Sequence, residues 1–146
     1  MGADVINSSL GYSTFDDASL NHTYADMDGN TTRISMAADL LASKGVLVVS
    51  SAGNEGNGSW HYITAPADGD SVLTIGAVDA NGNYVSFSGV GPTYDGRIKP
   101  NVVAQGSAAT IASTNGGVQT GNGTSFSSPI MAGMSACLWQ AHPDYT

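Results

Sequence analysis

The sequence is short of cysteine, of basic residues and of long apolar runs. Among 146 residues, Cys137 is the only cysteine, so no disulfide can form within the chain. Four Lys and Arg against twelve acidic residues give a net charge of −8, which disfavours binding to nucleic acid or to an anionic membrane surface. No apolar run approaches the ~20 residues of a membrane span. We therefore expect neither a nucleic acid nor a membrane as partner.

What remains is the composition of one ordinary domain. Hydrophobic residues make up 41% of the chain, enough for a core, and Cys137 is expected to be a small buried member of it. No basic segment followed by an apolar one opens the sequence, so no signal peptide is predicted. Because the chain opens on a strand-like stretch, we expect residues 1–146 to be a partial domain of a longer protein.

The first half alternates between strand and helix patterns. Residues 5–9 read as a strand and residues 46–49 as a fully apolar strand, which is typical of a sheet covered on both faces. Between them, residues 31–43 read as a helix that Thr31 or Thr32 can cap. Strand, helix and strand predict a right-handed parallel crossover and an α/β fold. The helix has apolar residues at i, i+3, i+4 and i+7, namely Ile34, Ala37, Ala38 and Leu41.

The second half continues with shorter elements. Residues 72–78 predict another strand, and an Asn-Gly turn at 81–82 suggests that residues 84–88 return as its neighbour. Extended pieces follow near 102–104, 108–113 and 117–120.

A glycine-rich turn at 121–123 then leads into a helix. Ser125 falls at the helix start, where its backbone N–H lacks a helical partner and the helix dipole is positive. A serine so placed can attack a carbonyl carbon while its N–H faces the oxygen that gains charge. Taken alone, Thr124 and Ser125 could instead simply cap a core helix. The helix that follows has apolar residues at helical spacing, namely Ile130, Met131, Met134, Cys137 and Leu138.

Several segments together resemble the subtilisin-like serine proteases, or subtilases. The Gly-Thr-Ser of 123–125, with Pro129 behind it, is similar to their serine motif. The Ala-Gly-Asn-Glu-Gly of 52–56 is similar to their oxyanion motif, and Ile-Asn-Ser-Ser-Leu-Gly at 6–11 to their substrate-binding strand. The resemblance implies a subtilisin-like three-layer fold with a mainly parallel sheet, truncated at its N-terminal side.

The resemblance also implies roles for individual residues. Ser125 would be the nucleophile of a serine endopeptidase, and the side-chain amide of Asn54 would complete the oxyanion hole. The two walls of the pocket for the substrate side chain would be Ser9, Leu10 and Gly11 on one side, and Ser51, Ala52 and Gly53 on the other. The floor should lie within residues 56–70, where no family pattern is apparent, so the preferred side chain is not predicted.

The general base is missing from this pattern. A serine nucleophile needs a base, usually His, oriented by a carboxylate, and neither of the corresponding subtilase motifs occurs here. His22, His61 and His142 lie in other surroundings, so we expect the isolated chain to be inactive. One alternative is a non-catalytic subtilase-like domain that binds peptides. Another is a structural α/β domain, which would leave Asn54 and Ser125 far apart.

Other expectations follow from the resemblance. No cofactor is required, although calcium is possible, and the partner is a peptide or protein substrate. The loop 26–30 lacks the full spacing of a cation loop and is interpreted as a solvated turn. An extracellular or cell-envelope location is implied, and a truncated sheet makes self-association possible through exposed strand edges.

Overall fold

A four-stranded parallel sheet forms the centre of the computed structural model, which describes residues 2–144. Its order is β1 (Val5–Ser8), β2 (Leu47–Ser51), β3 (Val72–Val78) and β4 (Val102–Gln105), and each neighbouring pair is parallel. All four strands therefore end at the same edge of the sheet, which is where open α/β sheets bind ligands.

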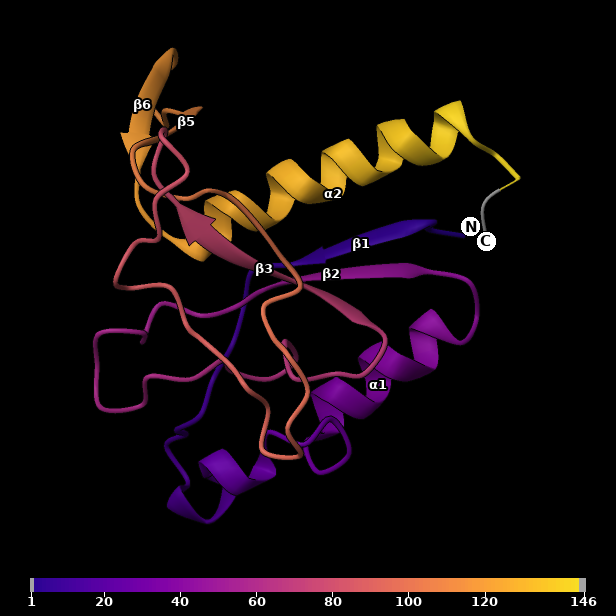
Figure 1. Ribbon diagram of the computed structural model, residues 1–146, viewed down its shortest axis with the longest axis vertical. Helices are drawn as coiled ribbons and strands as arrows, with labels where there is room; N and C mark the ends of the chain where they lie inside the picture. Colours follow the sequence, from indigo (N-terminus) through magenta and orange to yellow (C-terminus); the bar gives the residue numbers. More distant parts are fainter. Residues whose placement is uncertain (1, 145–146) are drawn as a thin grey trace.

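Two helices cover the two faces of this sheet (Figure 1). Helix α1 (Arg33–Ala42) lies on one face and α2 (Thr124–Ala141) on the other. The remaining elements of residues 2–144 are two short 3₁₀ turns and an antiparallel hairpin beside the start of α2. Their bounds are η1 (Ala18–Leu20), η2 (Tyr24–Asp26), β5 (Ala109–Ala112) and β6 (Val118–Gly121). The predicted three-layer α/β fold with a mainly parallel sheet is confirmed.

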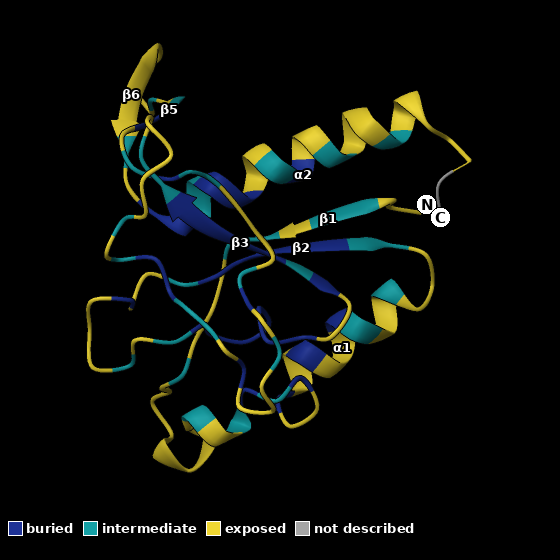
Figure 2. Ribbon diagram, viewed as in Figure 1, coloured by how far each residue is buried: buried dark blue, intermediate teal, exposed yellow. Residues whose placement is uncertain are grey.

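Strand β2 explains why both faces are covered. Its successive side chains point to opposite faces: Val48 packs with Ala38 of α1, whereas Val49 packs with Ala132 of α2. Both valines are buried, as Figure 2 shows for most of β2 and β3. The continuous apolar run at 46–49 thus contributes side chains to two hydrophobic cores, one under each helix.

Helix α1 begins as predicted but buries less of its apolar face than expected. The side chain of Thr32 accepts a hydrogen bond from the Ser35 N–H at the N-terminus. Ser35 in turn donates to Asp68, which is fully buried and also accepts from the Gly29 N–H. Of the four predicted core positions only Ala38 is buried, and Ile34 is 54% exposed.

Two further expectations were wrong. Residues 84–88 do not form a strand: only Tyr84 bridges to Val78, and the chain then turns, with the Ser88 N–H donating to Val85 O. Cys137 is exposed rather than buried. The outer side of α2 is likewise uncovered along Ile130, Met134 and Leu138, because no other element of residues 2–144 packs over them.

No helix within residues 2–144 is both long and apolar enough to cross a bilayer.

Lys99 is a buried cation at the start of β3 and β4. Its ammonium donates to Val72 O at 2.6 Å and to Asn101 Oδ1 at 3.0 Å. Burial, and secondarily the charge of Arg97, lower the pKa of Lys99 to about 8, although Asp39, Asp68 and Asp70 act in the opposite direction. The folded chain therefore releases this proton more readily than the unfolded chain.

We expect the free energy of unfolding to rise with pH between about pH 8 and 10.5. In that window the unfolded chain binds the Lys99 proton and the folded chain does not, so the free energy of unfolding increases by about 3 kcal/mol in total across the window. Urea denaturation of wild type and Lys99→Met across pH 7–11 measures the effect. Lys99→Met should flatten the slope, whereas Lys44→Met, at an exposed position after α1, should keep it. If stability changed with pH equally in all three proteins, the lowered pKa would not belong to Lys99.

Candidate active site

The carboxyl end of β1 and the amino end of α2 are joined by two hydrogen bonds. Ser125 Oγ donates to Ser9 O at 3.2 Å, and Ser9 Oγ donates to Ser125 O at 3.1 Å, across 116 residues of sequence. One turn further along α2, Ser128 Oγ donates to Asn7 Oδ1 at 2.6 Å. The helix start is therefore fixed to the strand whose last residues were predicted to bind substrate.

Asn54 is fixed to the same helix start by its side-chain oxygen. Asn54 Oδ1 accepts from the Thr124 N–H at 2.8 Å and from Thr124 Oγ1 at 3.0 Å. Because a backbone N–H can only donate, these bonds identify the oxygen of the amide and leave its Nδ2 donors available. Thr124 is fully buried. The sequence placed Thr124 in the serine motif but suggested only a helix cap; its role in holding Asn54 was missed.

Gly123 lies between the two donors proposed for an oxyanion. A Cβ placed on it would be 3.6 Å from Asn54 Nδ2 and 3.7 Å from the Ser125 nitrogen. Both donors therefore border one small space. The Ser125 N–H has no hydrogen-bond partner among residues 2–144, as expected at a helix start. Gly123 also has φ +151° and ψ +149°, a conformation essentially reserved for glycine.

The predicted site residues meet in a cavity of about 170 Å³. Asn54 and Ser125 both line it, so the alternative in which they lie far apart does not describe this molecule. Of the predicted wall residues only Ala52 is outside the lining, since its side chain packs against Ile63 and Ala67 in the core. The lining residues are Ser9, Leu10, Gly11, Tyr12, Ser51, Gly53, Asn54, Glu55, Thr64 and Ser125.

Thr64 closes the space between the two walls. Thr64 Oγ1 lies close to both glycines of the walls. A Cβ placed on Gly11 would be 2.3 Å from this oxygen, and a Cβ placed on Gly53 would be 2.9 Å from it. A second cavity, of about 470 Å³, shares Gly11, Tyr12, Glu55 and Thr64 with the first and is also lined by Trp60. The sequence predicts a pocket floor only within residues 56–70, and no local pattern distinguishes Thr64.

None of the histidines lines the cavity that contains Ser125. The ring of His22 contacts Phe15, and that of His61 lies edge-on to Tyr62 with Nδ1 2.6 Å from Gly56 O. His142 follows the end of α2. The Ser125 hydroxyl instead donates to a carbonyl oxygen, which cannot take up its proton.

The acidic residues also form no evident cation site. Within residues 2–144, no three His, Cys, Asp or Glu side chains cluster closely enough to hold a metal ion. In the loop 26–30, the Asp28 carboxylate accepts from Asn30 N, Thr31 N and Thr31 Oγ1, and Asp26 accepts from Thr23. These carboxylates are engaged in turn and cap hydrogen bonds, so the loop does not fit calcium.

Residues 1–146 match the Subtilase family along their whole length. The chain belongs to the subtilase family. Subtilisin DY of Bacillus licheniformis is 35% identical over 143 residues, which are 97% of this chain and 44% of that protein. Subtilisin NAT of Bacillus subtilis subsp. natto is 33% identical over 144 residues, 98% of this chain and 32% of that protein. The chain thus spans less than half the length of these curated subtilase relatives.

Solved structures agree with this assignment. The prenylagaramide maturation protease PagA covers 95% of the chain with a TM-score of 0.69 and 30% identity, and the match is 44% of that structure. The PatG macrocyclase in complex with peptide covers 98% with a TM-score of 0.73 and 25% identity, over 38% of that structure. The subtilase chain therefore has the fold of a part of these domains.

Proposed function

We propose that this subtilase chain carries the nucleophile and the oxyanion-binding groups of a serine endopeptidase. The observation that supports this most directly is the shared cavity of Asn54 and Ser125, with Asn54 oriented by two hydrogen bonds from Thr124. Subtilisins and maturation proteases among its relatives favour the same activity.

The proposed reaction is acyl transfer. Ser125 Oγ forms a bond to the carbonyl carbon of the substrate and gives its proton to a histidine supplied from outside this sequence. Asn54 Nδ2–H and Ser125 N–H donate to the oxygen that becomes negative. Cleavage of the C–N bond releases the amine with the proton from the histidine, and water then hydrolyses the ester. No cofactor takes part.

Substrate recognition is proposed for the two walls of the cavity. An extended peptide would lie along Ser9, Leu10 and Gly11, with its side chain entering between these residues and the segment 51–53. We place this activity outside the cell, in keeping with the acidic, lysine-poor composition. A peptide-binding domain without catalysis is the second candidate, favoured by the lack of any histidine lining the cavity.

A fluorophosphonate probe tests the proposal. The chain of 146 residues should react at Ser125 at least about 10³-fold more slowly than the longer gene product that supplies the histidine, because triad members act as a unit. Mass spectrometry of the labelled peptide and the Ser125→Ala variant identify the site. Strong labelling of the isolated chain would contradict the need for an external base. A longer gene product that binds peptides but is never labelled would support the binding domain.

Thr64→Gly should change which substrates the complete enzyme prefers. Removing the side chain between the two walls enlarges the pocket, so kcat/KM for Phe before the scissile bond should rise at least about tenfold relative to Ala. Thr64→Ser, which removes one methyl group, should give a smaller change. Peptide substrates that differ only at this residue measure the ratio, and an unchanged ratio in Thr64→Gly would show that Thr64 does not limit the pocket.

A further inference from the structure

Two tyrosine rings from distant parts of the sequence lie face to face. Tyr24 belongs to η2 and Tyr62 to the loop that follows β2, and their ring centroids are 3.9 Å apart with an angle of 20° between the planes. Aromatic pairs usually prefer centroid separations of about 4.5–7 Å. The two phenol rings therefore overlap more closely than most pairs, with ring carbons near van der Waals contact.

One short segment of the chain holds both rings in place. Tyr24 Oη donates a hydrogen bond to Pro92 O at 2.9 Å. The backbone of Tyr62 forms a parallel β-bridge with Val90, two residues before that proline. Both tyrosines are half-buried. Their stacking is thus set by a common support, and does not depend on the chance approach of two mobile side chains.

Overlapping phenol rings have the arrangement from which carbon–carbon coupling occurs. A phenol that loses one electron and one proton becomes a radical whose unpaired electron is shared between the oxygen and the ortho carbons. Two such radicals combine through ortho carbons that approach each other from the faces of the rings. Holding reactants within about 3–3.5 Å of each other removes most of the entropic cost of such an encounter.

We propose that Tyr24 and Tyr62 are an oxidative cross-linking site, at which hydrogen peroxide and a haem peroxidase join the two rings as dityrosine. Each phenol loses one electron and one proton, and a bond forms between one ortho carbon of each ring. Each of these carbons then gives up its hydrogen as a proton, which restores the hydroxyl group on the same ring. The peroxide takes up the two electrons and two protons and becomes two molecules of water.

This cross-link would supply a covalent restraint that the chain cannot obtain from cysteine. Cys137 is the only cysteine, so no disulfide can form within the chain. A bond between residues 24 and 62 closes a long loop, and Tyr62 lies two residues before Thr64 of the pocket. Closing a loop restricts the unfolded chain, so Tm should rise by up to about 10 °C. The inference goes beyond the proposed peptidase function and does not depend on it.

The other tyrosines that the structure describes are less well placed for coupling. Tyr94 meets Tyr24 edge-on, with centroids 5.7 Å apart and planes at 83°, and it is 59% exposed. Tyr12 is exposed and its ring contacts Phe15. Tyr84 is also exposed, and its hydroxyl donates to a backbone carbonyl. These rings can form bonds between separate chains but do not overlap another phenol.

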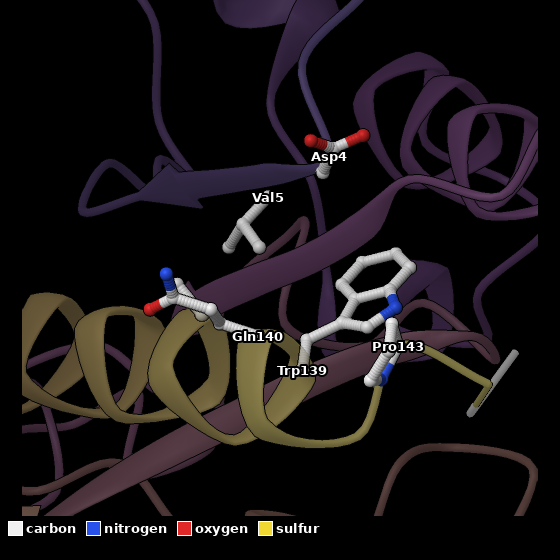
Figure 3. Close-up of a pocket in the computed structure, with 6 residues that line it drawn as sticks. Asp4, Val5, Trp139, Gln140 and Pro143 are labelled. Carbon is white, nitrogen blue, oxygen red and sulfur yellow. The ribbon is translucent and has the colours of Figure 1, made fainter.

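Trp139 is a competing target for oxidation, and its surroundings exclude the same product. Figure 3 shows its indole beside Pro143, in a groove of about 380 Å³ with Asp4, Val5 and Gln140 on its borders. No tyrosine of residues 2–144 lines this groove. A radical on Trp139 therefore has no phenol beside it, and Trp139→Phe serves as a control.

Treatment of the dilute chain with hydrogen peroxide and a haem peroxidase tests the site. The Cys137→Ser background is used because the exposed thiol would otherwise consume peroxide. The monomer should lose the mass of two hydrogen atoms and acquire dityrosine fluorescence. Trypsin cuts between the two rings at Arg33 and Lys44, so fragmentation of the joined peptides identifies the bonded tyrosines.

Matched variants assign the bond to this pair. Tyr24→Phe and Tyr62→Phe keep an aromatic ring in the stack but remove the phenol, and each should lower the yield of cross-linked monomer at least about tenfold. Tyr94→Phe and Trp139→Phe should cross-link like the background protein. Urea denaturation of the untreated variants checks that they are folded. Peroxide treatment should raise Tm in the background protein and not in Tyr62→Phe.

The proposal is overturned if the treated monomer keeps all its hydrogen atoms. It is also overturned if the bond joins Tyr94 or joins two separate chains instead, or if Tyr62→Phe cross-links as readily as the background protein. None of these measurements involves the chemistry of Ser125, so a failed cross-linking site and a failed peptidase proposal remain distinguishable.

Discussion

Asn54→Asp should abolish most of the activity of the complete enzyme while leaving the fold intact. The aspartate keeps an acceptor for both Thr124 bonds, at 2.8 and 3.0 Å in the wild type, but removes the Nδ2 donor. Its negative charge would also oppose that of the oxyanion. We expect kcat to fall by about 10²–10³ with little change in KM, a magnitude that was measured on subtilisin, a relative of this chain, and is borrowed here.

The matched variants separate catalysis from folding. Asn54→Ala removes donor and acceptor together and leaves the buried Thr124 groups unpaired, which should cost about 1–3 kcal/mol of stability in addition. Asn57→Ala, at an exposed position in the same loop, should change neither kcat nor the free energy of unfolding. Steady-state kinetics and urea denaturation provide both readouts. Retention of full activity by Asn54→Asp would rule out the side-chain amide as an oxyanion donor.

Gly123→Ala should damage both stability and activity. Its backbone, at φ +151° and ψ +149°, is unfavourable for any residue with a Cβ, so about 1–3 kcal/mol of unfolding free energy should be lost. The new methyl group would also border the space between Asn54 Nδ2 and Ser125 N, at 3.6 and 3.7 Å. A displacement of the oxyanion by about 1 Å there should lower kcat about 10²-fold.

Gly133→Ala is the control on the same helix. A Cβ at Gly133 has no neighbour within 4 Å, and the position is exposed within α2. Alanine should therefore stabilise the chain by up to about 1 kcal/mol and leave activity unchanged. If both glycine variants behaved alike in urea denaturation, the conformation assigned to Gly123 would be wrong.

The sequence predicted those parts of the molecule that depend on local patterns. The continuous apolar run 46–49 predicted a sheet covered on both faces. In the structure Val48 packs against Ala38 of α1 on one face, and Val49 packs against Ala132 of α2 on the other. The motifs around Asn54 and Ser125 come from strand and helix ends, and parallel topology brings such ends together. The roles of these residues stay predictions until the variants are measured.

Features that depend on contacts across the chain could not be predicted in this way. Thr64 lies in a segment without periodicity, and its importance is visible only from its approach to Gly11 and Gly53. Helical spacing predicted burial for Cys137, Ile34 and Leu41, but spacing shows only which side of a helix is apolar. Whether another segment covers that side is a property of the whole fold, and here Ile34 and Leu41 border an open groove.

The paired hydrogen bonds between Ser9 and Ser125 have a consequence for biosynthesis. They span 116 residues, so Ser125, the proposed nucleophile, reaches its position only after residues 9–125 have been synthesised and have folded together. Pairings of such high contact order form late and slowly. A nascent or partly denatured chain therefore lacks the assembled site that we propose for peptide cleavage.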